Sequence, residues 1–305
     1  MIKCRTCGSE NCEYYLTAKD LNQNKSNDKF KYYRCGNCES IFISPIPKNL
    51  SIYYGSDYPA YAVNKSHDQE LLINNLEEAK LNLVKQYATN GKLIEVGPAS
   101  GRFLKIASEN GYKVLGIEQD SECVNHIKNV LHINTILSNN PASELSKETS
   151  TCDIIVAWHV IEHLSNPQEF IVAVSKALLK PNGLVFISAP NPSALSFKVF
   201  GRHWVHLDAP RHLTLIPLKA LDNIMKSCGL ERVNCIFDDA VGLRLNKIGW
   251  ISSSINLYKN KIAHWLFFAW AGRILHLVMR PVERAHGNGA AYTVIYKNTG
   301  VISEK

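Results

Sequence analysis

The sequence predicts an α/β fold, built on a mainly parallel sheet and preceded by a small cysteine-rich module. Beyond Gly91, short apolar runs alternate with amphipathic stretches of helical spacing, a pattern typical of βαβ units. Two CxxC pairs lie close to the amino terminus. A composition of 46% hydrophobic and 20% charged residues over 305 residues is that of an ordinary folded chain, with room for one main domain and an appendage.

The amino-terminal module, residues 1–50, contains the pairs CRTC and CGNC. Their four thiols have the spacing of a tetrahedral zinc site in a ribbon built from short hairpins. Since protein fills all four positions, no coordination position remains for water, and we expect structural rather than catalytic zinc. The predicted ligands are Cys4, Cys7, Cys35 and Cys38.

Residues 51–90 are expected to form a linker and a lead-in helix. The segment SPIPKNLSIYYGSDYPAY is rich in proline and tyrosine and predicts a chain without regular structure. From Ser66 onward, leucines recur at helical spacing, and Gly91 can end that helix.

Residues 91–305 contain the alternating pattern of the predicted sheet. Helices are expected after Gly101, Ser121 and Pro167, and over residues 217–228. The expected strands, in chain order, are KLIEV, YKVLGIE, INTIL, CDIIVAW, GLVFISA, RVNCIFD and AAYTVIYKN.

The stretch LIEVGPASGRF, residues 93–103, places a glycine turn at the end of the first of these strands. The carboxyl ends of parallel strands are where such sheets bind ligands, and Gly97 and Gly101 allow the chain to turn sharply there. Arg102 stands where a dinucleotide site would want another glycine. Glu118, at the end of the second strand, can accept both hydroxyls of a ribose. A nucleoside without a pyrophosphate is therefore the expected ligand.

These residues resemble the class I S-adenosylmethionine-dependent methyltransferases, whose first motif is an acid followed by GxGxG. Here Ala99 replaces the central glycine. The likeness continues through VLGIEQD, CDIIVAWHVIEHLSNPQEF, LLKPNGLVFISAPN and LDAPRHLT, in that order, over residues 91–240. The resemblance implies a Rossmann-like sheet of six parallel strands and one antiparallel strand, with S-adenosylmethionine as the cofactor.

The resemblance also implies which residues hold the cofactor. Glu118 would hold the ribose, Gln119 would flank the adenine and Asn139 would reach the adenine amine. Trp158 and His159 would line the sulfonium. The residues expected around the methionine part are Glu95, Gly97, Pro98, Ala99, Gly101 and Phe103.

Three residues are candidates for catalysis. His163, in HVIEHL, lies at the mouth of the predicted cofactor site and titrates near neutrality; in the resembling family its counterpart acts either as a base or as a positioning group. The long loop after the fifth strand supplies Asp208 and His212 as alternative bases. A structural role, in which Asp208 pairs with Arg211 to fix the loop, is the competing interpretation.

An insert of about 50 residues, with a helical part expected at 243–285, separates the last two strands. Its segment 259–281 is apolar and aromatic but too short and too interrupted for a membrane span. Of the net charge of +7, the excess resides in residues 241–305, which hold nine Lys or Arg residues against two Glu. A helix lying on a membrane surface, or gripping a lipid diphosphate carrier, fits this pattern. The alternatives are a helical hairpin that closes the core and a homodimer contact.

A cysteine-pair module ahead of such a domain resembles the amino-terminal part of sugar C-methyltransferases and their relatives in surface-polysaccharide gene sets, with YYGSDYPAY as the lid. The expected function is methyl transfer, at oxygen or carbon, to a small-molecule or lipid-linked sugar. RNA methylation is an alternative, but nucleic acid is disfavoured because the excess charge accompanies the apolar insert rather than the cysteine module. A further alternative is that the protein is a non-catalytic scaffold that binds the cofactor. No secretion signal is recognisable, so we expect a cytoplasmic protein, or one peripheral to the inner face of the membrane.

Overall fold

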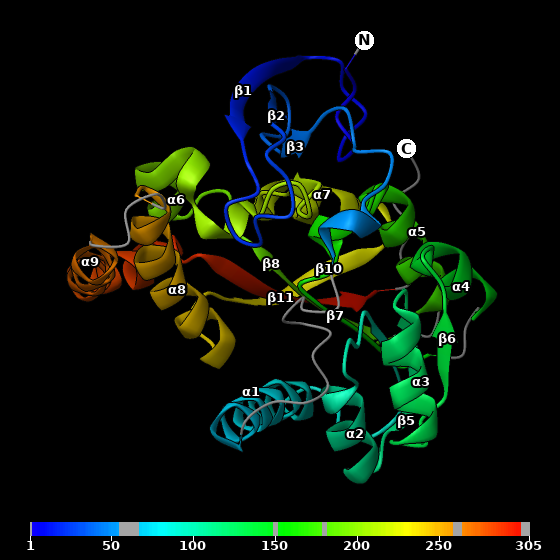
Figure 1. Ribbon diagram of the computed structural model, residues 1–305. Helices are drawn as coiled ribbons and strands as arrows, with labels where there is room; N and C mark the ends of the chain where they lie inside the picture. Colours follow the sequence, from blue (N-terminus) through cyan, green and yellow to red (C-terminus); the bar gives the residue numbers. More distant parts are fainter. Residues whose placement is uncertain (1, 55–66, 149–151, 179–181, 259–263, 300–305) are drawn as a thin grey trace.

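The computed structural model describes residues 2–54, 67–148, 152–178, 182–258 and 264–299, which form two sheets and their covering helices (Figure 1). Strand β11 is antiparallel to both of its neighbours, and all other adjacent pairs in the large sheet are parallel. The predicted sheet of six parallel strands and one antiparallel strand is thus confirmed. Across this sheet the strands are β10 (Leu230–Ile236), β11 (Ala291–Asn298), β8 (Leu184–Pro190), β7 (Ile154–Trp158), β4 (Lys92–Val96), β5 (Lys113–Glu118) and β6 (Thr135–Leu137).

Both faces of the large sheet are buried under helices. Successive residues of a strand point to opposite faces, so neighbouring residues belong to different cores. Leu93 and Ile154 belong to the core on one face, whereas Ile94 and Ile155 belong to the core on the other. The first face is covered by α1 (His67–Lys85), α2 (Arg102–Glu109) and α3 (Ser121–Asn129), and the second by α4 (Pro141–Lys147), α5 (Pro167–Ala177) and α7 (Leu218–Ser227).

The cysteine-rich module forms a small antiparallel sheet that is completed by the main domain. Its strands are β1 (Cys12–Ala18), β2 (Phe30–Cys35), β3 (Ile41–Ile43) and β9 (Thr214–Leu215). Strand β9 comes from the loop after β8, and Ile41 pairs with Leu215. In Figure 1 the amino-terminal strands stand above the large sheet, and α1 and α2 lie below it. The sequence predicted the module but not this shared edge.

The loop between β8 and β9 is fixed by a buried ion-pair cluster. The Arg211 side chain is fully buried, and its Nη2 lies 2.7 Å from Asp20 Oδ1 of the module and 2.7 Å from Asp208 Oδ1 of its own loop. The pairing of Asp208 with Arg211, one of the two interpretations of this loop, is therefore present. The loop also contains α6 (Leu195–Phe200) and the short 3-10 turns Gly201–His203 and Val205–Leu207.

Two helices, α8 (Ala240–Asn256) and α9 (Trp265–His286), fill the connection between β10 and β11 and lie side by side (Figure 1). They approach closely at Gly272, where a Cβ atom would lie 2.7 Å from the Cα of Ile251. No helix in the described ranges is long and apolar enough to cross a membrane.

The linker before α1 begins with a single 3-10 turn, Ser51–Tyr53, where the sequence predicted no regular structure. The proposed lid segment continues into residues 55–66, which lie outside the described residues.

Candidate active site

The glycine turn after β4 has the conformation that its residues allow. Gly97, Ala99 and Gly101 all have positive φ angles, of 69°, 50° and 75°. Space also demands glycine at two of these positions, because a Cβ on Gly97 would lie 2.7 Å from Val160 Cγ2, and one on Gly101 would lie 2.6 Å from Ile127 Cγ1. The sequence interpretation assigned these glycines to a sharp turn of the chain, and the structure shows that side-chain packing against the turn also requires them.

Glu118 joins this turn to the end of β5. Its Oε2 accepts a hydrogen bond from the Ala99 amide at 2.8 Å, and its Oε1 accepts from the amides of Gln119 and Asp120 at 2.7 and 2.9 Å. Burial raises the pKa of Glu118, and the three amides oppose that shift. Each carboxylate oxygen has further lone-pair capacity. The carboxylate is therefore held in place and can still accept hydroxyl groups.

Two buried polar atoms nearby have no hydrogen-bond partner within the described part of the chain. They are Oε2 of Glu95, at the end of β4, and Nε1 of Trp158, at the end of β7. Burial raises the pKa of Glu95 well above its usual range. Because an unsatisfied buried polar group is costly, these two atoms indicate a place prepared for a polar ligand. A cofactor with an amino-acid end fits them.

The remaining predicted cofactor residues surround the same strand ends. Phe103 is buried and packs edge-to-face on Trp158, with ring centroids 5.6 Å apart. Pro98 is buried within the turn. His159 has a φ of 59° and donates its backbone N–H to Ser188. Gln119 and Asn139 are exposed.

Helix α1 contributes a residue to this site that the sequence reasoning missed. Lys80 Nζ lies 5.6 Å from the centroid of the Trp158 ring and forms an ion pair with Glu77 at 2.9 Å. Lys80 and Glu77 also act on the pKa of Glu95, in opposite directions. The sequence gave no signal of this role, because Trp158 ends β7, which lies several strands and helices later in the chain.

The candidate bases His163 and His212 lie together, beside Glu162. Their ring centroids are 4.7 Å apart, and one ligand atom from each of the three residues lies within 4.8 Å of the others. Burial lowers the pKa of His163 to about 4. His163 is thus neutral at physiological pH, but it is a weaker base than an ordinary histidine.

Asp208, the third candidate, is already engaged by the loop. Its Oδ1 and Oδ2 accept hydrogen bonds from Arg211 Nη2 and Nε at 2.7 and 2.9 Å, and Oδ1 also accepts from Asn22. Burial opposes ionisation, yet Arg211 holds the pKa of Asp208 below its usual value. Its lone pairs are directed to the loop rather than to the glycine turn.

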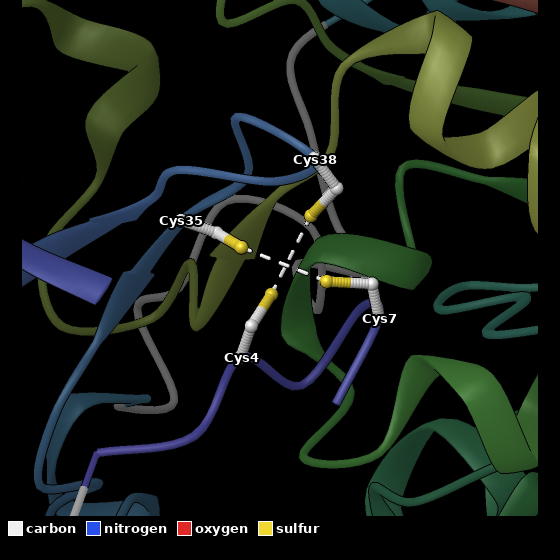
Figure 2. A group of neighbouring side chains, drawn as sticks. All are labelled: Cys4, Cys7, Cys35 and Cys38. Carbon is white, nitrogen blue, oxygen red and sulfur yellow. Dashed lines mark hydrogen bonds between the residues drawn. The ribbon is translucent and has the colours of Figure 1, made fainter. Parts of the chain in front are cut away.

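The four module cysteines form a separate cluster. Figure 2 shows the sulfur atoms of Cys4, Cys7, Cys35 and Cys38 pointing toward a common centre. Cys4 Sγ lies 3.5 Å from Cys38 Sγ, and Cys7 Sγ lies 3.6 Å from Cys35 Sγ. The hydrogen bond with Cys38 lowers the pKa of Cys4 to about 5. The cluster could bind zinc, because four converging thiols at these distances suit a tetrahedral ion.

Comparison with known proteins agrees with this geometry. A family model described as a methyltransferase domain matches residues 66–234. The ubiquinone biosynthesis O-methyltransferase of Pasteurella multocida (strain Pm70) is 24% identical over 213 residues, which cover 60% of this chain and 84% of that protein. The protein of the same name from Colwellia psychrerythraea is 31% identical over 112 residues, covering 35% of this chain and 44% of that protein.

Solved structures share the fold. A SAM-dependent methyltransferase from Archaeoglobus fulgidus matches with a TM-score of 0.51 and 19% identity, covering 73% of this chain and 94% of that one. Phosphoethanolamine N-methyltransferase 2 from Haemonchus contortus, in complex with S-adenosyl-L-methionine, matches with a TM-score of 0.50 and 16% identity, covering 94% of this chain and 68% of that one.

Proposed function

Because the chain belongs to the methyltransferase-domain family, and is therefore an S-adenosylmethionine-dependent methyltransferase of small molecules, we propose that it methylates a hydroxyl oxygen of a sugar or glycoconjugate precursor. The observation that carries the cofactor half of this proposal is the orphaned pair Glu95 Oε2 and Trp158 Nε1 beside the glycine turn. Oxygen as the accepting atom is supported by the names of the curated relatives, which are O-methyltransferases. The sugar class rests on the resemblance of this architecture, a cysteine module ahead of the domain, to sugar methyltransferases.

The side chains divide the binding task between them. Glu118 would hold the ribose hydroxyls, while Glu95 and the backbone of residues 97–101 would hold the methionine part. Trp158 and His159 would line the position of the sulfonium. S-adenosylmethionine, when bound, supplies an electrophilic methyl group, so the protein must mainly align the acceptor oxygen and take up its proton.

Among the catalytic candidates, we place His163 and His212 beside the acceptor hydroxyl, where each offers a ring-nitrogen lone pair. The Nδ1 atom of His163 lies 3.0 Å from the Arg211 carbonyl, and Nδ1 of His212 lies 2.8 Å from the His206 carbonyl. A carbonyl oxygen only accepts, so Nδ1 carries the hydrogen and Nε2 keeps its lone pair. Asp208 is assigned a positioning role through Arg211.

The four-cysteine cluster is proposed to hold structural zinc. The cluster supplies four protein ligands and thus leaves no coordination position for a substrate. The zinc would stabilise the small sheet, whose strand β9 begins two residues after His212.

Helix α9 is proposed to rest on an anionic membrane surface and so to bring a lipid-linked acceptor to the site. Exposed apolar side chains repeat along it at helical spacing, and the exposed Arg273 and Arg280 border this stripe. Such a helix buries its apolar face among lipid head groups while arginines contact anionic lipid. The exposed apolar residues are Trp265, Leu266, Phe267, Trp270, Ile274, Leu277, Val278 and Val282.

Methyl transfer from labelled cofactor tests the function directly. Purified protein and S-adenosylmethionine with a radiolabelled methyl group are incubated with separated nucleotide-sugar, lipid-linked sugar and RNA fractions. We expect alkali-stable label in a sugar-containing fraction. Label in RNA would overturn the acceptor class, and cofactor binding without label in any fraction would favour the scaffold alternative.

A further inference from the structure

The group formed by Glu162, His163 and His212 carries an inference beyond the methyl-transfer site. Glu162 lies in the 3-10 turn Ile161–His163 after β7, and its side chain is 1% exposed. Neither of its carboxylate oxygens has a hydrogen-bond partner in the described part of the chain. His159 Nδ1 lies 3.5 Å from Oε1 and forms an ion pair with it only when His159 is protonated. A buried carboxylate without donors is costly unless a cation satisfies it.

One ring nitrogen of each histidine lies within 4.8 Å of a Glu162 carboxylate oxygen, and Nε2 of His212 also lies 4.0 Å from Asp208 Oδ2. Their Nδ1 atoms are held by the backbone carbonyls of Arg211 and His206, which leaves each Nε2 as an acceptor. Histidines that bind metals almost always donate their other ring N–H in this way, to a carbonyl or a carboxylate. Three acceptors therefore converge, and none of them can donate to another.

The site is rigidly built from distant parts of the chain. His212 follows Arg211, whose side chain is buried between Asp208 and Asp20. The next residue, Leu213, donates its amide to the Glu162 carbonyl at 2.7 Å. From the module, the buried Tyr32 hydroxyl donates to the His212 carbonyl at 3.0 Å. These contacts hold His212 against a turn that lies about fifty residues earlier in the chain.

We propose that Glu162, His163 and His212 bind a divalent cation that also coordinates the acceptor hydroxyl. Two imidazoles and one carboxylate form a three-ligand set that leaves positions open for substrate. The site lies one turn beyond Trp158 and His159, where the sulfonium is expected. The cysteine cluster is a different site, with four thiol ligands and none in common with this one.

The catalytic half of this inference rests on the proposed function. A coordinated hydroxyl loses its proton to water more readily than a free one. Its oxygen then bonds to the methyl carbon, and the carbon–sulfur bond breaks to leave S-adenosylhomocysteine. The cation would lower the free energy needed to deprotonate the hydroxyl, and it is neither oxidised nor reduced.

Manganese is a suitable probe because it prefers oxygen and nitrogen ligands to thiolates. The full chain, with its cysteine cluster saturated by zinc, is titrated with Mn²⁺ and followed by electron paramagnetic resonance. We expect one saturable Mn²⁺, with spin-echo modulation from imidazole nitrogen. The modulation is specific, because a merely structural role for the histidines would not produce it.

Three substitutions remove one ligand each and preserve the surroundings. Glu162→Gln keeps the shape of the side chain, and His163→Asn and His212→Asn keep a donor toward the same carbonyls while removing Nε2. Each should weaken Mn²⁺ binding at least about tenfold, a loss of roughly 1.4 kcal/mol, and the histidine variants should lose nitrogen modulation. Glu169→Gln, an exposed neighbour in α5, should bind Mn²⁺ as the unaltered protein does.

Binding is measured without substrate, so its outcome is independent of the proposed acceptor. Non-saturable Mn²⁺ binding, or equal affinity in the three variants and the control, would overturn the site. If one Mn²⁺ binds but methyl transfer proceeds equally well after removal of all metal except the cysteine-bound zinc, the catalytic half is wrong. If a variant does not fold, as judged by its thermal melting, the other two decide.

Discussion

Glu118 is the residue whose contacts most directly link the turn to the cofactor. It accepts three backbone hydrogen bonds, from Ala99, Gln119 and Asp120, so its position is fixed before any ligand arrives. A preorganised acceptor loses little entropy when it receives ribose hydroxyls. Its removal should therefore be felt mainly in cofactor affinity.

Replacing Glu118 with Ala should weaken binding of S-adenosylhomocysteine at least about tenfold, since hydrogen bonds to a charged group are worth ~1.5 to 3 kcal/mol. Calorimetric titration measures the affinity. Glu118→Gln retains the size of the side chain and separates loss of charge from loosening of the turn. Glu122→Ala, at an exposed position early in α3, is the matched control. Unchanged affinity in both Glu118 variants would remove this residue from the site.

At the residue scale, the sequence predicted best the positions of residues that follow from the pattern of a single strand. Glu118 and Trp158 each end a strand and Glu95 is the last residue but one of its strand, and the carboxyl ends of parallel strands meet at one edge. Lys80 was not recognised, and Tyr54 was expected only as part of the lid segment, because nothing in the pattern of a helix or a linker says which strand end it will cover. Tyr54 contacts His163 Nδ1 at 3.0 Å, a contact that only the folded chain reveals.

At the scale of elements, the strands were predictable and their outer partners were not. The alternation of strand and helix patterns predicted a mainly parallel large sheet, and the family resemblance implied its one antiparallel strand. Strand β9 has two residues, too few to show any periodicity, and it pairs with β3 from the other end of the chain. Helices α8 and α9 were expected as an insert, but the packing at Gly272 follows from long-range contacts.

The exposed stripe of α9 should hold the protein on anionic vesicles. Leu266→Glu together with Trp270→Glu replaces two exposed apolar side chains with charges that anionic lipid repels. Since a fully buried side chain of this size is worth ~1.5 to 3 kcal/mol, we expect at least about tenfold weaker retention by phosphatidylglycerol vesicles at low salt. Vesicle sedimentation provides the measurement.

Two comparisons sharpen the interpretation of that experiment. Leu71→Glu changes an exposed leucine on α1 and should leave vesicle binding unaltered. If the unaltered protein is not retained by vesicles, and the α9 variant instead converts a dimer to a monomer in analytical ultracentrifugation, the stripe is a subunit contact and the membrane proposal is wrong.

Removal of zinc should loosen the small sheet. Cys35→Ser deletes one of four converging thiols, whereas Cys12→Ser alters a cysteine outside the cluster. Because metal binding contributes directly to the folding of such modules, we expect Cys35→Ser to lose bound zinc and to melt at a lower temperature. Elemental analysis and thermal unfolding measure both effects. A full zinc content in Cys35→Ser, or an equal loss in Cys12→Ser, would contradict this assignment.

At the scale of the whole molecule, the module and the methyltransferase sheet form one connected structure. The small sheet ends in β9, and the core between the two parts includes Tyr32, Trp204 and Trp250. The sequence separated these parts because composition changes sharply between them. Composition describes each segment separately. It does not show that Arg211 of the loop is buried against Asp20 of the module.

Substitutions in the buried ion-pair cluster around Arg211 test whether the module and the main domain stabilise each other. Arg211→Met leaves Asp20 and Asp208 buried with their common cation removed, and breaking a buried pair in this way costs ~3 to 5 kcal/mol. The control is Arg232→Met, which breaks the exposed pair with Asp222 and should cost at most ~1 kcal/mol. Urea unfolding measures both free energies. Asp20→Asn should fall between them, because Arg211 keeps Asp208. Equal effects of Arg211→Met and Arg232→Met would show that the two parts are stabilised independently, since the cluster then adds no more than a surface pair.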